Sequence, residues 1–222
     1  MIDIRLRADT APLRLLADRA LYWPAQDCLV LADVHLGKGD VFRRQGLAVP
    51  AGASVSDLSR IDALLAACGA RRLLVLGDLV HAAPPERRAP WVAAVQDWRA
   101  RHTELDLWLV VGNHDRAPRR LASLLGLELL DEGTPLGGLR LWHDAPAEDT
   151  EPGLGGHIHP ALHWRGGARQ RLRLPVFWQR GAQLILPAFG GLTGGYAIRP
   201  QAGDRVWAAG PDTVAALPLP AP

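Results

Sequence analysis

A chain of 222 residues is long enough to bury a substantial core, in one large domain or two small ones. Its composition, 48% hydrophobic and 22% charged, is that of a globular protein and excludes a disordered one. The formal charge of +2 is too small to indicate nucleic-acid binding by itself, and every apolar run is shorter than the roughly 18 residues that a membrane span needs.

The cysteines and the N-terminus bear on the compartment. Cys28 and Cys68 lie far apart and form no CxxC pair, which favours a reduced cytosolic protein over a disulfide framework. The first residues, MIDIRLRADT, contain arginines but no apolar segment after them, so we expect no signal peptide. Together these features predict a cytoplasmic protein.

Three short apolar runs predict buried strands over residues 28–34, 73–79 and 105–111. Between the first two, apolar residues recur at helical spacing over 54–69 and stop at a glycine. A second amphipathic helix opens after Pro90 and fills the next interval. The alternation of strand and helix implies parallel strands joined by right-handed crossovers.

The second half of the chain changes character. Residues 118–126 predict a short helix, and the chain beyond it consists mostly of strands and glycine-rich loops. The strands are predicted over 139–143 and 169–174 and in a hairpin that turns at Arg180-Gly181. Without an internal repeat or a low-complexity linker, we expect a single domain over 1–222, with a frayed tail over 213–222.

Acidic, amide and histidine side chains follow these strands, at or just beyond the point where each strand ends. They are Asp33 and His35, Asp78 with His81 nearby, Asn113-His114-Asp115, His143, and His157 with His159. Open α/β sheets place their ligand sites beyond the carboxyl ends of the strands, so we expect these residues to meet. In the two X-x-His pairs, an extended backbone would send residues i and i+2 toward one metal.

The ligand types indicate which metals would bind. A mixture of carboxylate, amide oxygen and imidazole suits Mn²⁺, Fe or Zn²⁺ and not a Cys-type structural zinc. Seven ligands are too many for one tetrahedral ion, so we expect two ions and one bridging carboxylate. Asp78 is the best candidate for the bridge, because it is central in the series and Gly77 permits close approach. Two ions roughly 3.5–4 Å apart can activate a shared water for in-line displacement at phosphorus.

Each motif by itself has a simpler interpretation. An isolated Asp-x-His is usually a surface loop, and Gly-Asn-His-Asp could be a turn, since Gly, Asn and Asp all favour turns. Six of the eight histidines, however, fall in these motifs or beside them, in a fixed order after apolar strands. The joint pattern therefore favours a metal centre.

The ordered series resembles the calcineurin-like metallophosphoesterase superfamily, in the segments Asp33-x-His35, Gly77-Asp78, Gly112-Asn113-His114-Asp115, His143 and Gly156-His157-x-His159. The resemblance implies an α/β fold, a four-layer αββα sandwich with mixed sheets. It implies that the first metal is held by Asp33, His35, Asp78 and His159, and the second by Asp78, Asn113, His143 and His157. It also implies that His114 protonates the leaving group or stabilises the transition state, and that Asp115 orients His114.

Longer segments are similar to the ligase-associated DNA damage response phosphodiesterase/endonuclease family, often called PdeM. They include RALYWP (19–24), ADVHLGKGDVFRRQGLAVP (32–50), GGHIHPAL (155–162) and LILPAFGGLTGG (184–195). This resemblance implies a bacterial enzyme that uses Mn²⁺ and a metal-bridging hydroxide to cleave phosphodiesters of DNA in repair. It also implies a functional association with an ATP-dependent DNA ligase, a helicase and an exonuclease. Gly191 stands where we expect alanine, a minor departure.

Basic and aromatic residues near the motifs are candidates for substrate contacts: Lys38, Arg43, Arg44, His81 and Arg116. Lysine and arginine can reach phosphate oxygens beside the metals. The glycine-rich segment 187–195 could bring backbone N–H groups to a ligand. Phe42 and Phe189 could stack on bases, or belong to the core.

Two other functions are open. One is a phosphomonoesterase or pyrophosphatase acting on a small metabolite, and the other is a non-catalytic partner of a DNA ligase complex. A single predicted helix separates Asp78 from Asn113, which favours an open cleft and a long substrate. The intact ligand set and the presence of His114 favour an enzyme.

Overall fold

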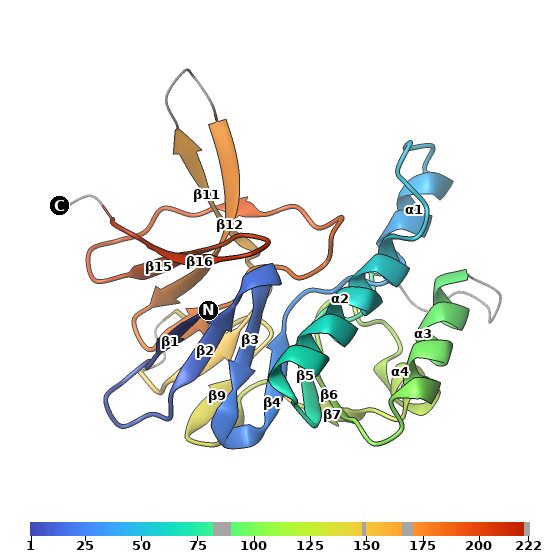
Figure 1. Ribbon diagram of the computed structural model, residues 1–222, viewed down its shortest axis with the longest axis horizontal. Helices are drawn as coiled ribbons and strands as arrows, with labels where there is room; N and C mark the ends of the chain where they lie inside the picture. Colours follow the sequence, from blue (N-terminus) through green and yellow to red (C-terminus); the bar gives the residue numbers. More distant parts are fainter. Residues whose placement is uncertain (82–89, 148–149, 166–170, 220–222) are drawn as a thin grey trace.

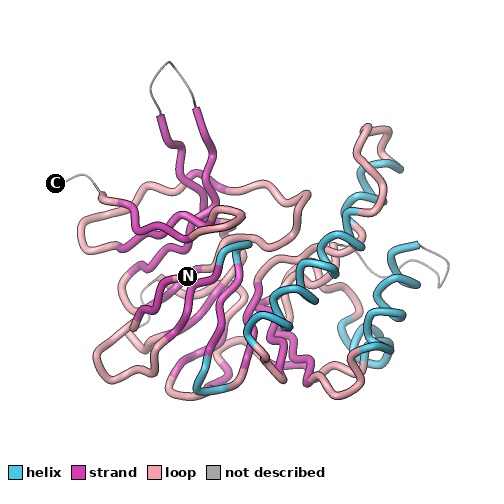
Figure 2. The backbone as a smooth tube through the Cα atoms, in the orientation of Figure 1, coloured by secondary structure: helices cyan, strands magenta, loops and turns pink. Residues whose placement is uncertain are grey.

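The computed structural model describes residues 1–81, 90–147, 150–165 and 171–219. Two β-sheets face each other in the larger part of the molecule, and the helices lie to one side (Figure 1, Figure 2). None of the helices in those ranges combines the length and the apolar character that a membrane crossing requires. Residues 82–89, part of the interval where a single helix was expected, lie outside the described ranges.

The first sheet contains, in order, β1 (Ile2–Ile4), β2 (Leu13–Leu16), β3 (Ala20–Trp23), β4 (Cys28–Leu31), β5 (Arg72–Leu76), β6 (Asp106–Val110) and β7 (Glu128–Leu130). Strands β1 to β4 pair antiparallel, and β4 to β7 pair parallel. The parallel strands β4, β5 and β6 are the three predicted from apolar runs. Helical crossovers between consecutive strands account for their parallel direction.

The helices are η1 (Ala17–Arg19), η2 (Pro24–Gln26), α1 (Lys38–Arg44), α2 (Ala53–Cys68), α3 (Pro90–Arg101) and α4 (Pro118–Leu125). Gly69 ends α2 and Gly126 ends α4, both in the left-handed conformation that glycine adopts without strain. The predicted helices are confirmed as α2, α3 and α4, whereas α1 was not predicted. Apolar side chains of these three helices share one buried cluster with the first sheet.

The second sheet has the order β14-β11-β12-β13-β10-β9-β8, with β15 and β16 continuing from β12. Its strands are β8 (Thr134–Leu136), β9 (Leu139–Leu141), β10 (Gly153–Gly155), β11 (Pro160–Arg165), β12 (Arg171–Arg180), β13 (Gln183–Ile185), β14 (Tyr196–Ala197), β15 (Arg205–Ala209) and β16 (Val214–Leu217). Arg180 pairs with Gln183, so the predicted hairpin at Arg180-Gly181 is confirmed. The hairpin of β11 and β12 projects from the sheet (Figure 1).

The first sheet is buried on both faces. Along β4, Leu29 and Leu31 point into the cluster beneath the helices, and Cys28 and Val30 point into the cluster shared with the second sheet. Alternation between two apolar environments explains why the parallel strands read as continuous apolar runs. The predicted α/β class with two mixed sheets is confirmed, and the described residues form a helical layer over the first sheet only.

Two boundary predictions are corrected. The predicted strands 28–34 and 73–79 end earlier, at Leu31 and Leu76, because the chain leaves the sheet to form the loops that carry the polar residues. The frayed tail predicted over 213–222 is wrong for Val214–Leu217, which pairs antiparallel with β15 as β16. Residues 220–222 of that tail, and residues 169 and 170 of the predicted strand 169–174, lie outside the described ranges.

Candidate metal centre

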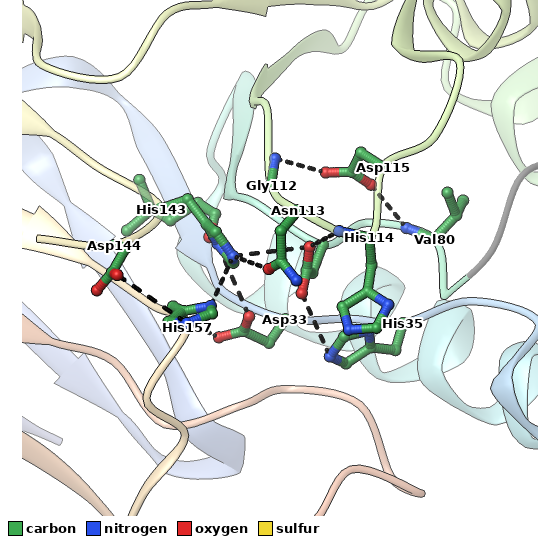
Figure 3. Close-up of polar contacts among 12 residues, drawn as sticks. Asp33, His35, Val80, Gly112, Asn113, His114, Asp115, His143, Asp144 and His157 are labelled. Atoms are coloured by element: carbon green, nitrogen blue, oxygen red, sulfur yellow. Dashed lines mark hydrogen bonds and ion pairs between the residues drawn. The ribbon is translucent and has the colours of Figure 1, made fainter.

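The predicted ligands come together from both sheets. The loops after β4, β5 and β6 supply Asp33 with His35, Asp78, and Asn113. The second sheet supplies the remaining histidines, from the loop after β9 and the loop between β10 and β11 (Figure 3). The carboxyl ends of parallel strands thus meet at one edge, as expected, and the second sheet closes the site.

The backbone at these ligands is left-handed, so the prediction of an extended backbone is wrong. The residues with positive φ are Asp33 (+54°), His35 (+52°), Asp78 (+50°), His157 (+62°) and His159 (+51°). Asp33 and His35 nevertheless converge, since their ligand atoms lie within 4.8 Å of each other, while Val34 between them is 1% exposed and packs in the helix-side core. Left-handed non-glycine residues cost about 1–3 kcal/mol each, and such strain is concentrated at functional sites.

The first group consists of Asp33, His35 and His159, whose ligand atoms all lie within 4.8 Å of one another. Asp33 Oδ1 is 3.2 Å from His159 Nε2. Among the described residues, Asp33 Oδ1 and both ring nitrogens of His35 are buried without a hydrogen-bond partner. Burial lowers the pKa of His35 to about 2, so its ring is neutral and able to coordinate a cation. A bound metal would satisfy these atoms.

The second group is built around His143. Its Nδ1 lies 3.1 Å from the Leu76 carbonyl, which can only accept, so in the neutral ring Nε2 is an acceptor. Asn113 Oδ1 is 2.9 Å and His157 Nδ1 is 3.1 Å from this Nε2. The Asn113 amide oxygen and His143 Nε2 are both acceptors, and two acceptors this close together favour a cation between them. Asp144, whose Oδ2 is 4.0 Å from His157 Nε2, can orient that ring from behind.

Asp78 faces both groups with different oxygens. Its Oδ2 is 3.8 Å from His35 Nε2, and its Oδ1 is 3.7 Å from His143 Nε2. Asp33 also lies within 4.8 Å of ligand atoms in both groups. However, Asp33 Oδ1 approaches His143 at Nδ1, 3.9 Å away, and that nitrogen is already held by the Leu76 carbonyl, whereas Asp78 faces the metal-side Nε2. The geometry therefore favours Asp78 over Asp33 as the bridging carboxylate.

Two glycines permit this convergence. A Cβ on Gly77 would lie 1.9 Å from His143 Nδ1, and a Cβ on Gly112 would lie 2.3 Å from Asp78 Oδ1. Neither distance is compatible with a side chain, because both neighbours are held in place. The sequence-based expectation that Gly77 permits close approach is confirmed, with His143 as the group that approaches.

His114 lies beside the metal groups, and the Asp115 carboxylate contacts backbone amides. Asp115 is buried and accepts the amides of Val80 at 3.1 Å and Gly112 at 3.0 Å, so it holds two loops together. Burial raises the pKa of Asp115 to about 6. The His114 ring makes a polar contact with the His81 carbonyl, 3.3 Å from Nδ1, and the His81 ring stacks on it at 5.0 Å.

The candidate substrate residues differ in position. Burial lowers the pKa of Lys38, whose charge interacts with Asp33 and Asp78, so this lysine lies beside the metal groups. Arg43 hydrogen-bonds the Asp40 side chain, and Arg44 donates to the Asp40 carbonyl at 3.4 Å, so both arginines are engaged on α1 itself. Arg116 is exposed in the turn that carries His114. His81 lies within the site, stacked on the His114 ring.

The glycine-rich segment 187–195 supports the site from behind. Phe189 is fully buried, so the core alternative is correct for it, and the next amide in the chain donates to the Asp33 carbonyl at 3.2 Å. Arg60 stacks on the Phe189 ring at 4.0 Å and donates to Asp57, which accepts another amide of the segment at 3.0 Å. Sequence reasoning missed this network, although an Asp on the apolar face of α2 was a signal.

Metal removal should destabilise the protein. Chelation leaves the buried Asp33 and Asp78 carboxylates close together, with Lys38 beside them as a partial counter-charge. Saturation with metal at about 100 Kd contributes roughly 2.7 kcal/mol, which corresponds to a Tm decrease of about 5–10 °C on chelation for a chain of this size. Differential scanning fluorimetry with Mn²⁺ and with EDTA measures it. An equal Tm in both buffers would contradict a metal centre here.

These features define the class of the protein: two mixed sheets that bring Asp, Asn and His ligands to one edge are the framework of a metal-dependent phosphoesterase. The crystal structure of Pseudomonas putida nuclease MPE is similar, with a TM-score of 0.81 and 40% sequence identity over 97% of this chain and 99% of that chain. The chain therefore belongs to the PdeM-like family of metallophosphoesterases.

A second solved structure, the phosphoesterase Yfce from E. coli, has a TM-score of 0.42 and 19% identity over 82% of this chain and 86% of that chain. That similarity is too low to support a conclusion about the fold. No protein-family model and no curated protein matches the chain.

Proposed function

We propose that this phosphoesterase is a dinuclear phosphodiesterase that cleaves DNA. The observation that carries the proposal is the position of the Asp78 carboxylate, with one oxygen toward His35 and the other toward His143. On the first side lie the Asp33 and His35 atoms that have no hydrogen-bond partner among the described residues. On the second side lie two acceptors, His143 Nε2 and Asn113 Oδ1. This arrangement fits two cations that share one carboxylate.

Two bound divalent cations would supply the positive charge that activates water and stabilises the oxygens of a phosphate under in-line attack. Mn²⁺ is our proposal from the family resemblance, and Fe or Zn²⁺ would suit the same ligands. The chain itself contributes the Lys38 ammonium group, which can bind a phosphate oxygen. It also contributes His114, whose Nδ1 faces the His81 carbonyl and whose imidazolium form can give the Nε2 proton to the leaving oxygen.

The choice of DNA has two supports. The similar P. putida protein is a nuclease by description, and the longer segments of the chain resemble a DNA-repair family. The same resemblance supports a cytoplasmic role in bacterial DNA repair beside an ATP-dependent DNA ligase, a helicase and an exonuclease. The exposed Asn113 and His157 and the part-exposed His159 make the candidate centre reachable by a long substrate.

A pair of chromogenic substrates tests the reaction. With Mn²⁺ we expect hydrolysis of bis-p-nitrophenyl phosphate to exceed that of p-nitrophenyl phosphate by at least about tenfold in kcat/KM, and EDTA to abolish both. End-labelled single-stranded DNA, duplex DNA and RNA of one sequence then identify the polymer. Retention of activity in EDTA, or no hydrolysis of the diester, would refute the proposal.

The two alternatives give different results in the same assay. A clear preference for the monoester would indicate a phosphomonoesterase or pyrophosphatase. A protein that binds two metals but hydrolyses neither compound nor any of the labelled polymers would indicate a non-catalytic partner. The intact arrangement around His114 favours catalysis.

A further inference from the structure

A cavity adjoins the candidate metal centre. It has a volume of about 640 Å³, within the range of about 300–1,000 Å³ that is usual for ligand sites. His157 and His159 form the wall that it shares with the metal centre. The opposite wall comes from β12 and from residues 194–199 around β14, of which Gly194 and Gly195 belong to a motif of the sequence.

The floor of the cavity is apolar and rigid. Trp178 is 8% exposed and Ile198 is 6% exposed, and both belong to one core cluster against which Ile158 packs. The Trp178 indole donates to Asp204 Oδ2 at 2.8 Å, which fixes the plane of its ring. A flat apolar floor of this kind can receive a planar base without rearrangement.

Tyr196 stands at the rim of the cavity with 68% of its surface exposed. Its amide donates to the His159 carbonyl at 2.8 Å, and β14 pairs with β11 through Tyr196 and Ala197. The backbone that carries the exposed ring is therefore fixed beside a predicted metal ligand. Core packing does not account for an aromatic side chain in this position, whereas base stacking does.

The cavity also carries positive charge. Arg180 lies 5.0 Å from the Trp178 ring and donates to the Ala145 carbonyl at 3.4 Å, but its buried Nε has no hydrogen-bond partner among the described residues. Arg199 is exposed on the same wall. A guanidinium group is suited to phosphate oxygens, so aromatic and cationic groups together match a nucleotide.

We propose that this cavity is a nucleotide subsite, which holds the residue next to the scissile phosphate with its base against Tyr196 and its outer phosphate toward Arg180 and Arg199. The inference rests on the proposed phosphodiesterase function, because a strand bound at the metals must continue past His157 and His159. A peptide or a small anion would leave either the aromatic rim or the cationic wall without a partner.

Replacement of Tyr196 tests the subsite. On a short single-stranded DNA with Mn²⁺, we expect Tyr196→Ala to raise KM about 5- to 150-fold, the range for one lost base stack, while kcat and bound metal per chain stay the same. Tyr196→Phe should stay within about threefold of the unsubstituted protein because it keeps the ring. Leu172→Ala, an exposed apolar residue of β12 that does not line the cavity, is the matched control.

Two further measurements separate the possible failures. In the first, a single abasic residue is moved along the oligonucleotide. At one position the missing base should raise KM for the unsubstituted protein, and at that position Tyr196→Ala should cause no further increase in KM. Fluorescence anisotropy of the labelled oligonucleotide in EDTA should show weaker binding by Tyr196→Ala without any turnover. Equal KM and equal binding for Tyr196→Ala, in a protein that does cleave DNA, would overturn the subsite. No cleavage by the unsubstituted protein would instead overturn the proposed function.

Discussion

Asp78→Asn should remove metal from both groups at once and lower diesterase activity at least about 10³-fold. The two carboxylate oxygens of Asp78 face His35 and His143, and the amide replaces one of them with an NH₂ group that cannot coordinate. Loss of the metal charge removes several kcal/mol of transition-state stabilisation. Elemental analysis of the purified variant and hydrolysis of bis-p-nitrophenyl phosphate measure the two effects.

Two comparison variants make this result specific. Asp33→Asn should empty only the first group, because Asp33 Oδ1 approaches His143 at Nδ1, the nitrogen held by the Leu76 carbonyl. Asp212→Asn, in an exposed turn before β16, should keep both metals and full activity. In EDTA, Asp78→Asn should be at least as stable as the unsubstituted protein, since it removes one of two neighbouring buried carboxylates. One metal retained by Asp78→Asn would mean that Asp78 does not bridge.

The positions of the ligands could be predicted because they depend on the direction of the parallel strands. Leucine- and valine-rich runs followed by Asp33, Asp78 and Asn113 are enough to place those residues at one sheet edge. The local backbone could not be predicted in the same way. Left-handed φ at Asp33 and His35 is stabilised by long-range hydrogen bonds from their amides to the carbonyls of Gly77 and Asp78. No pattern within the motif encodes those partners.

The outer strands show a similar limit. β16 and the three N-terminal strands pair with strands next to them in the chain, but each has only three or four residues, too few for an apolar alternation to mark a strand. The cavity beside the metal centre is built from Ile158, Trp178 and Ile198, which are separated by about 20 residues each. Spacing within a motif is informative for ligands that share one loop, but not for a surface assembled from three separate segments of the chain.

The strongest test of the chemistry is His114→Ala, which should keep both metals and lower kcat by about 10²- to 10⁴-fold. The His114 amide donates to Asp78 Oδ1 at 2.8 Å, and alanine keeps that bond. Among the described residues, the polar and stacking contacts of the ring outside the ligand set are to His81 only, so its loss should leave the metal groups in place. His163→Ala, an exposed histidine of β11, is the matched control.

The leaving group decides whether His114 acts as a proton donor. A DNA alkoxide needs a proton as it departs, whereas p-nitrophenolate is stable without one. His114→Ala should therefore impair cleavage of an oligonucleotide far more than hydrolysis of bis-p-nitrophenyl phosphate. An equal decrease on both substrates would assign His114 to stabilisation of the phosphorane-like charge instead, and loss of metal from the variant would place it in the ligand set. A selective decrease on DNA would identify His114 as the proton donor, acting through Nε2 of its imidazolium form.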